Sequence, residues 1–221
     1  MIMNRLSRRR LLWGFLAVAL GGTVGAAVWT SQRFWPRQGG WDERALEGLK
    51  NFGTVPDFSL MERSGKPFGL ADLRDKIWIA NFIYTNCKDT CPLQSAEMAR
   101  LQNDLMDKTD VKLVSISVDP ERDTPQALSQ YAGRFKADPD RWLFLTGEKR
   151  EIYRIAQEGF RLSAAPASNA GRENDASILH SARFVLVDGK AQIRGYYQST
   201  DAEAMTRLSR DLKTLLGKDK R

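Results

Sequence analysis

Histidine and cysteine are scarce in this protein. Its 221 residues contain one histidine, His180, and two cysteines, Cys87 and Cys91, which are separated by three residues. Two cysteines this close in sequence cannot form the disulfide framework that stabilises small secreted folds. The sequence therefore predicts a local chemical role for these two thiols.

Charged side chains are missing between Leu11 and Gln32. The apolar part, residues 11–29, approaches the roughly 20 residues that cross a bilayer as a helix. Four arginines precede it and two follow soon after. Because flanking positive charge stays on the cytoplasmic side, we predict that residues 1–32 form a cytoplasmic N-terminus and one transmembrane helix. The rest of the chain would lie in the periplasm, or in the equivalent mitochondrial intermembrane space.

A cleaved signal peptide is the alternative, since a basic start followed by an apolar run is typical of one. No convincing small-residue cleavage motif precedes Trp29. Residues 7–12 also weakly resemble a twin-arginine export signal. Each of these alternatives also exports the domain.

Acidic residues and lysine are absent from residues 1–40, which contain six arginines. Without these arginines the formal net charge of +7 falls to +1 for residues 41–221. A nearly neutral domain lacks the basic surface that nucleic-acid binding requires. We therefore exclude nucleic acid as a partner.

The chain divides into an anchor, a linker and one domain. Residues 33–40 contain one proline and two glycines, which predicts a linker. Residues 41–221 then form a domain of ordinary size. Within it, residues 163–177 are small and polar without apolar periodicity, which predicts a mobile loop.

Strand and helix patterns alternate along the domain. Residues 76–84 and 111–118 are dense apolar runs typical of buried central strands, with a helix opened by Pro92 between them. Thr124 and Pro125 are a typical helix start. The other expected elements are two short strands within 55–70, a strand at 142–145, a helix at 148–158, a hairpin of 184–187 with 192–197 around Asp188-Gly189, and a helix from Asp201 to near Gly217. This order predicts an α/β fold with a central mixed sheet and helices on both faces.

Cys87 and Cys91 follow the run 76–84 directly, at the carboxyl end of a predicted buried strand, where open α/β sheets usually place their sites. Cys91 is expected just before the first helical turn, where exposed amides and the helix dipole favour a thiolate. A thiolate is required both for metal binding and for nucleophilic attack. The position therefore favours a redox dithiol or a metal site over two incidental small apolar residues.

His180 precedes the predicted strand 184–187. A lone histidine is more often a surface or core residue than a ligand. Two thiolates and one imidazole, however, form a soft set with few ligands that suits Cu(I) and also holds Cu(II), whereas structural zinc usually requires four protein ligands. Residues 119–125 (DPERDTP) are expected at the same sheet edge, either lining the site or serving only as a turn and helix cap.

Three segments resemble the Sco/SenC family of thioredoxin-like copper proteins. They are residues 84–98 (YTNCKDTCPLQSAEM), 117–131 (SVDPERDTPQALSQY) and 180–197 (HSARFVLVDGKAQIRGYY). The C-x-x-x-C-P spacing, the D-P-x-x-D-T-P run and the histidine before a hairpin occur in family order. The resemblance covers most of residues 52–215 and implies a thioredoxin-like fold.

The resemblance also implies a membrane-anchored metallochaperone that binds one copper ion, Cu(I) or Cu(II), through Cys87, Cys91 and His180. Such a protein assists copper insertion into cytochrome c oxidase, either by delivering copper or by reducing the cysteines of the oxidase's copper site. The implied partners are the copper-bearing oxidase subunit or another copper chaperone, and a thiol reductant. Lys88 stands where many members carry proline, which leaves the ligands intact and favours nearby thiolates.

Three other functions compete with this one. A metal-independent thiol–disulfide oxidoreductase would use Cys87 and Cys91 as redox-active thiols that form a disulfide, but such proteins resemble one another in C-x-x-C spacing and in a cis-proline, which would fall near Ser181. A peroxidase of the same fold would resemble T-x-x-C, whereas Thr85 is two residues before Cys87. A scaffold with incidental thiols predicts that replacing Cys87 changes nothing.

Overall fold

Strand β3 (Ile77–Ile83) lies in the interior of the sheet, and all seven of its residues are buried. It pairs in parallel with β4 (Val111–Ser117), from Ile77 opposite Val111 to Ile83 opposite Ser117. Parallel strands need a crossover connection, which contains helix α2 (Thr90–Asp104). The predicted strand–helix–strand unit is confirmed.

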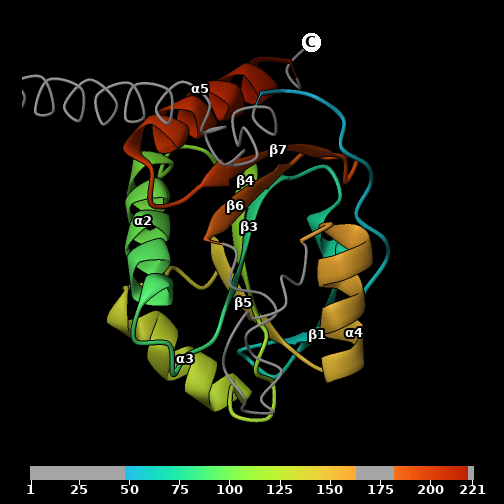
Figure 1. Ribbon diagram of the computed structural model, residues 1–221, viewed down its shortest axis with the longest axis vertical. Helices are drawn as coiled ribbons and strands as arrows, with labels where there is room; N and C mark the ends of the chain where they lie inside the picture. Colours follow the sequence, from blue (N-terminus) through green and yellow to red (C-terminus); the bar gives the residue numbers. More distant parts are fainter. Residues whose placement is uncertain (1–47, 163–181, 219–221) are drawn as a thin grey trace, which may run out of the picture. The chain divides into compact units, whose positions relative to one another are not determined.

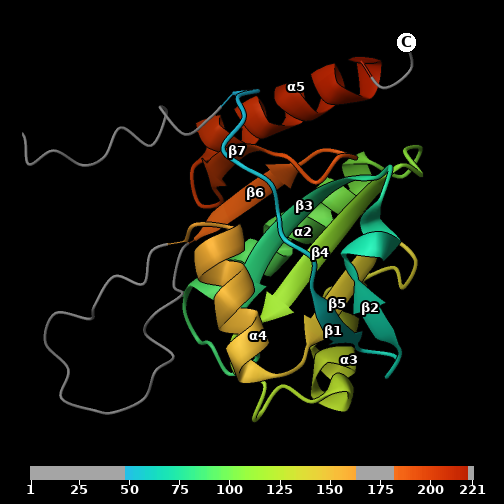
Figure 2. The ribbon, with the colours of Figure 1, turned by 90° about the vertical axis from the view of Figure 1, so that its right-hand side faces the viewer.

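The computed structural model describes residues 48–162 and 182–218. In this part of the chain one mixed sheet has the strand order β2-β1-β5-β4-β3-β6-β7. Strands β3, β4 and β5 are parallel and lie side by side in Figure 2, and the other pairs are antiparallel. The remaining strands are β1 (Ser59–Glu62), β2 (Pro67–Gly69), β5 (Trp142–Thr146), β6 (Arg183–Val187) and β7 (Ile193–Gln198).

Helices cover both faces of the sheet (Figure 1). Helices α2 and α3 (Pro125–Arg134) lie on one face, and α4 (Lys149–Arg154) lies on the other. Helix α5 (Ala202–Lys218) packs against β7. A 3₁₀ helix (Leu70–Leu73) precedes β3, and a π-helical turn (Ile155–Gly159) continues α4. The predicted α/β class with a mixed sheet and flanking helices is confirmed.

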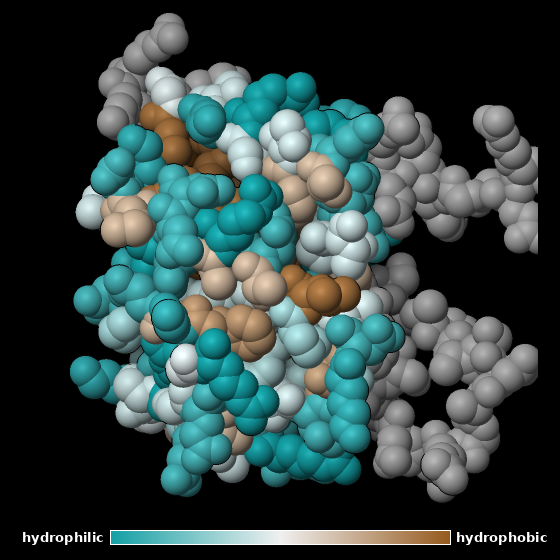
Figure 3. Space-filling model, turned by 90° about the vertical axis from the view of Figure 1, so that its left-hand side faces the viewer, coloured by the Kyte–Doolittle hydropathy of each residue, from teal (hydrophilic) through white to brown (hydrophobic). Residues whose placement is uncertain are grey.

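Side chains of the central strands alternate between two hydrophobic cores, as the pleat of a strand requires. Ile77, Ile79 and Ile83 face the core under α2, α3 and α5. Trp78 and Phe82 face the core under α4. The outer surface over α2 and α3 is mostly hydrophilic with scattered hydrophobic spots, so these helices direct most of their apolar side chains inward (Figure 3).

A chain of buried polar side chains crosses the core under α2. Trp142 Nε1 donates to Ser115 Oγ at 2.9 Å, and Ser115 Oγ donates to Asn81 Oδ1 at 2.7 Å. Asn81 Nδ2 then donates to Gln94 Oε1 at 3.0 Å. These hydrogen bonds therefore join β5, β4 and β3 to α2. They reach α2 at Gln94, three residues after Cys91 in the sequence.

Several predictions concern residues outside those described. The transmembrane helix of residues 1–32, the linker 33–40 and the loop 163–177 all lie there. Among residues 48–162 and 182–218, no helix combines the length and the hydropathy needed to span a membrane.

Asn81 provides a test of the buried polar chain. Replacing Asn81 with Ala removes the acceptor of the Ser115 hydroxyl and the donor to Gln94 Oε1, which we expect to lower the free energy of unfolding by about 3 kcal/mol. Asn103→Ala is the control, because that side chain is exposed on the same helix as Gln94 and is expected to change stability by less than about 0.5 kcal/mol. Urea unfolding followed by circular dichroism measures both; equal stability of the two variants would contradict the expected role of Asn81.

Candidate metal centre

The two cysteines lie where the chain passes from the end of β3 into the start of α2, in a segment that we call the dithiol loop (residues 84–91). Cys91 is the second residue of α2. The prediction that it precedes the first helical turn is wrong by this small margin. Pro92 is tolerated as the third helical residue because the first N–H groups of a helix have no acceptor within it, so the helix begins upstream of the proline.

Hydrogen bonds within the dithiol loop bring the thiols together. The amide of Cys91 donates to Cys87 Sγ at 3.4 Å, and the amide of Cys87 donates to the carbonyl of Tyr84 at 3.2 Å. Cys87 is 7% exposed and Cys91 is 3% exposed. Both are free thiols. The structure thus places two adjacent sulfur atoms just below the surface.

Cys87 is the more acidic thiol. Burial by itself raises its pKa, but hydrogen bonds from the backbone amides of Cys91 and Asp89 act in the opposite direction. The Cys91 thiol and the Tyr84 side chain also donate to Cys87. Together these donors outweigh burial and lower the pKa of Cys87 to about 7. A substantial fraction of Cys87 is therefore thiolate at neutral pH.

Cys91 is the less acidic thiol. Burial is the largest cause that raises the pKa of Cys91, and a hydrogen bond with the backbone of Tyr84 opposes it. Its hydrogen bond to Cys87 and the negative charges of Cys87 and Asp123 act in the same direction as burial, and together these effects raise the pKa of Cys91 to about 12. The loop thus pairs a thiolate at Cys87 with a protonated thiol at Cys91.

The segment 119–125 lies at the same sheet edge as the dithiol loop, as the sequence predicts. Strands β3 and β4 are parallel and end opposite one another, so the segments that follow them meet. Asp123 accepts hydrogen bonds from Thr85 in the dithiol loop. Thr124 caps α3 by accepting from the amide of Ala127 at 3.3 Å. The segment therefore both lines the site and caps a helix.

The third predicted ligand, His180, lies outside the described residues. Within residues 48–162 and 182–218, no three His, Cys, Asp or Glu side chains are grouped closely enough to hold a metal ion. The described part of the chain supplies two soft sulfur donors, Cys87 and Cys91. This donor chemistry fits copper, and the third donor stays a prediction.

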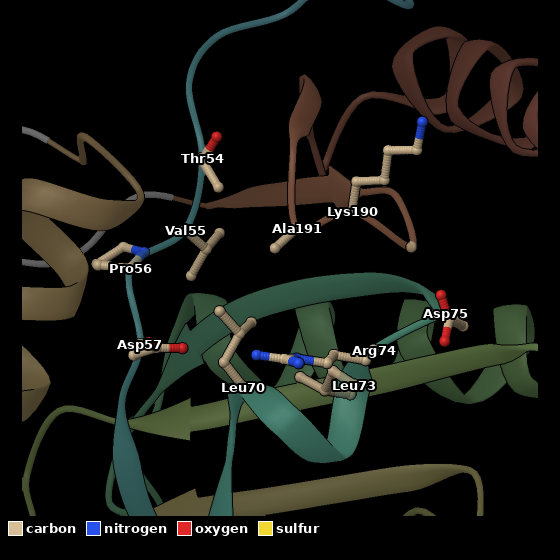
Figure 4. A pocket seen from close by; sticks show the side chains of 11 residues that line it. Thr54, Val55, Pro56, Asp57, Leu70, Leu73, Arg74, Asp75, Lys190 and Ala191 are labelled. Atoms are coloured by element: carbon tan, nitrogen blue, oxygen red, sulfur yellow. The ribbon is translucent and has the colours of Figure 1, made fainter.

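A cavity of about 460 Å³ lies at the opposite edge of the sheet (Figure 4). Leu73, Arg74 and Asp75, just before β3, form part of its wall. Asp57 and Arg74 point toward one another across it, while Lys190 points away. Because β3 spans roughly 23 Å at about 3.3 Å per residue, this cavity contributes nothing to the dithiol loop.

Known proteins similar to this chain point to one family. The family model SCO1/SenC matches residues 47–217. The SCO1 protein homolog of Bacillus subtilis (strain 168) is 37% identical over 140 residues, which cover 62% of this chain and 70% of that protein. The structure of BsSco, described as a member of the Sco family of cytochrome c oxidase assembly proteins with a disulfide switch, has 30% identity and a TM-score of 0.63, covering 76% of this chain and 98% of its own. Copper-bound Bradyrhizobium japonicum ScoI has 27% identity and a TM-score of 0.54, covering 72% and 99%.

The unequal acidity of the two thiols predicts different pH profiles for alkylation. Because only the thiolate reacts, the rate at Cys87 should rise by about tenfold from pH 6 to pH 8 and then level off, whereas the rate at Cys91 should still rise by about tenfold per pH unit above pH 8. Iodoacetamide labelling of the reduced, metal-free chain measures both. Trypsin cuts after Lys88, so each cysteine is quantified in its own peptide. Parallel profiles that both rise beyond pH 9 would contradict the assignment.

Proposed function

The chain belongs to the SCO1/SenC family, and from this premise we propose that it is a copper-binding protein that assists the assembly of cytochrome c oxidase. The observation that carries the proposal is the pair of adjacent thiols at the end of β3, with the Cys91 amide on Cys87 Sγ. Thiolates are soft ligands that select Cu(I). The copper-bound and oxidase-assembly relatives support the same function.

We propose Cys87, Cys91 and His180 as the ligands of one copper ion per domain. The topology supports His180 through β6, which runs antiparallel to β3 with Val185 opposite Ala80. The start of β6 therefore lies near the end of β3, at the edge that carries the dithiol loop. His180 is only three residues before Arg183, where β6 begins. Copper is cargo in this function, so the site must both bind and release it.

The two thiols have different parts in capturing copper. Cys87 offers a thiolate at neutral pH, whereas Cys91 must give up its proton as it binds. Metal binding to thiolates therefore releases protons, and the affinity should increase with pH. A ligand that leaves the set would allow the ion to pass to a partner, and His180 is our candidate for that ligand.

A second candidate function is metal-independent thiol–disulfide exchange, which the low pKa of Cys87 favours. The Cys87 thiolate would attack a partner disulfide and release one partner thiolate. The Cys91 thiol would then lose its proton, attack Cys87 Sγ and release the second partner thiol. Two thiols of this chain are oxidised to a disulfide and one partner disulfide is reduced. The disulfide switch described for BsSco is consistent with this chemistry.

We further propose a membrane-anchored location with the domain in the periplasm or an equivalent compartment. The uncharged run of residues 11–29 supports the anchor. The proposed partners are the copper-bearing subunit of the oxidase or another copper chaperone, together with a thiol reductant that restores Cys87 and Cys91. No nucleic acid is involved.

Copper titration tests the proposed thiol ligands. The reduced full chain in detergent should bind one Cu(I). Cys87→Ser and Cys91→Ser should each weaken this binding by at least about 100-fold, because the loss of even an outer-shell partner lowers metal affinity by roughly 10- to 100-fold. Competition with a Cu(I) chelator measures the affinity. Ser95→Ala is the control, since Ser95 is buried on α2 one turn after Cys91. A wild-type chain that binds no copper but exchanges disulfides would favour the second candidate.

Replacing His180 tests the third ligand. His180→Ala should weaken both Cu(I) and Cu(II) binding and abolish the thiolate-to-Cu(II) charge-transfer band. His180→Met supplies a soft thioether and should recover most Cu(I) affinity but not the Cu(II) spectrum. Chelator competition and visible absorption report the two ions separately. Unchanged affinity for both ions in His180→Ala would show that the imidazole is not a ligand.

A further inference from the structure

We propose that Asp123 is the positioning residue of the dithiol loop, and that it acts through Thr85. The carboxylate of Asp123 is 0% exposed. It lies in the turn between β4 and α3, 38 residues from Thr85 in the sequence. Thr85 in turn precedes Cys87 by two residues. The inference rests on the proposed function only for its copper measurement.

Three donors converge on this carboxylate. Thr85 contributes two, its amide to Oδ2 at 3.0 Å and its hydroxyl to Oδ1 at 2.6 Å. Ser117 Oγ donates to Oδ2 at 2.6 Å. Among the described residues, Asp123 forms no ion pair, so these hydrogen bonds are what compensates its removal from water. A buried carboxylate held in this way has a defined orientation.

The turn that carries Asp123 is itself held in place. The amide of Asp123 donates to the carbonyl of Asp119 at 2.9 Å, and the amide of Asp119 donates to Ser117 Oγ at 3.1 Å. Ser117 is the last residue of β4 and lies opposite Ile83, the last residue of β3. Asp123 is therefore fixed relative to the end of the strand from which the dithiol loop departs.

Thr85 transmits this restraint to the sulfur atoms. Both its amide and its side chain are bound by one carboxylate, which fixes the backbone between Tyr84 and Cys87. The next turn is closed by the Cys87 amide on the Tyr84 carbonyl, and the following contact is the Cys91 amide on Cys87 Sγ. Asp123 touches neither sulfur by a hydrogen bond, so its effect on the thiols passes through the loop.

Single-amide hydrogen exchange of the full chain tests this role without copper. Asp123→Ala removes the acceptor of all three hydrogen bonds, so the amides of Thr85 and Cys91 should exchange roughly tenfold faster or more, while the amides of the β3–β4 ladder are unchanged. Cu(I) affinity should fall by roughly 10- to 100-fold, the usual loss for an outer-shell partner.

Asp123→Asn is the conservative variant. Its carbonyl still accepts from the Thr85 amide, and its NH₂ group donates to the Thr85 hydroxyl, which accepts as readily as it donates. We expect it to recover most of the wild-type exchange and copper affinity. Thr85→Val removes only the hydrogen bond from the Thr85 hydroxyl to Asp123, and its effect on exchange and copper affinity should lie between those of wild type and Asp123→Ala. Adding Thr85→Val to Asp123→Ala should change little more, because both substitutions break the same contact.

Asp211 provides the matched control. It is also a buried aspartate, 7% exposed, and it lies on α5, where it accepts a hydrogen bond from Tyr197 Oη of β7 at 2.7 Å. Asp211→Ala should lower stability without altering exchange at Cys91 or copper affinity. The proposal is overturned if Asp123→Ala changes the exchange rate of the Cys91 amide and the copper affinity no more than Asp211→Ala does. If Asp123→Ala does not fold, the proposal is overturned when Asp123→Asn and Thr85→Val both behave as wild type. A wild-type chain that binds no copper would reject the proposed function, and amide exchange alone would then decide the role of Asp123.

Discussion

The parallel pairing of β3 with β4 is the constraint on which the site depends. Its register aligns Ile77 with Val111 and Ile83 with Ser117, so the two strands end together. The dithiol loop and the turn that carries Asp123 leave from these two ends. Because side chains alternate along a strand, a slip of one residue would turn the apolar residues of β3 toward the wrong cores and separate the two loops.

A polar pair inside the apolar core favours this register. Asn81 and Ser115 are cross-strand partners in the β3–β4 pair, and they hydrogen-bond at 2.7 Å with 0% exposure. In any other register both would lose this buried partner, a cost that apolar contacts alone would not impose. Asn81 also binds Gln94 of α2, so the same pair sets the position of the helix that carries Cys91. The polar chain contributes to structural specificity at the place where the thiols need it.

Local patterns in the sequence were sufficient to predict the strands around the site and the start of α3. The dense apolar runs correspond to β3 and β4, and Thr124 caps α3 as expected. The sequence did not predict the position of Cys91 inside the helix, because a proline in the first turn marks the start of a helix only to within a few residues. The role of Asp123 was missed for a different reason. Its partner Thr85 is 38 residues away, and such a contact depends on the sheet register and not on a local pattern.

The two candidate functions share one arrangement of thiols, so the thiols alone do not choose between them. A thiolate at Cys87 beside a protonated Cys91 suits an attacking and a resolving sulfur, and the same pair supplies two soft ligands. What separates the functions is a third donor. Strand β6 brings the chain back to the edge of the sheet where β3 ends, and Ala182 is already fixed there by Ser199, whose amide donates to its carbonyl at 2.7 Å. Ala182 is two residues after His180 in the sequence, and this is the reason that we rank copper binding above metal-independent exchange.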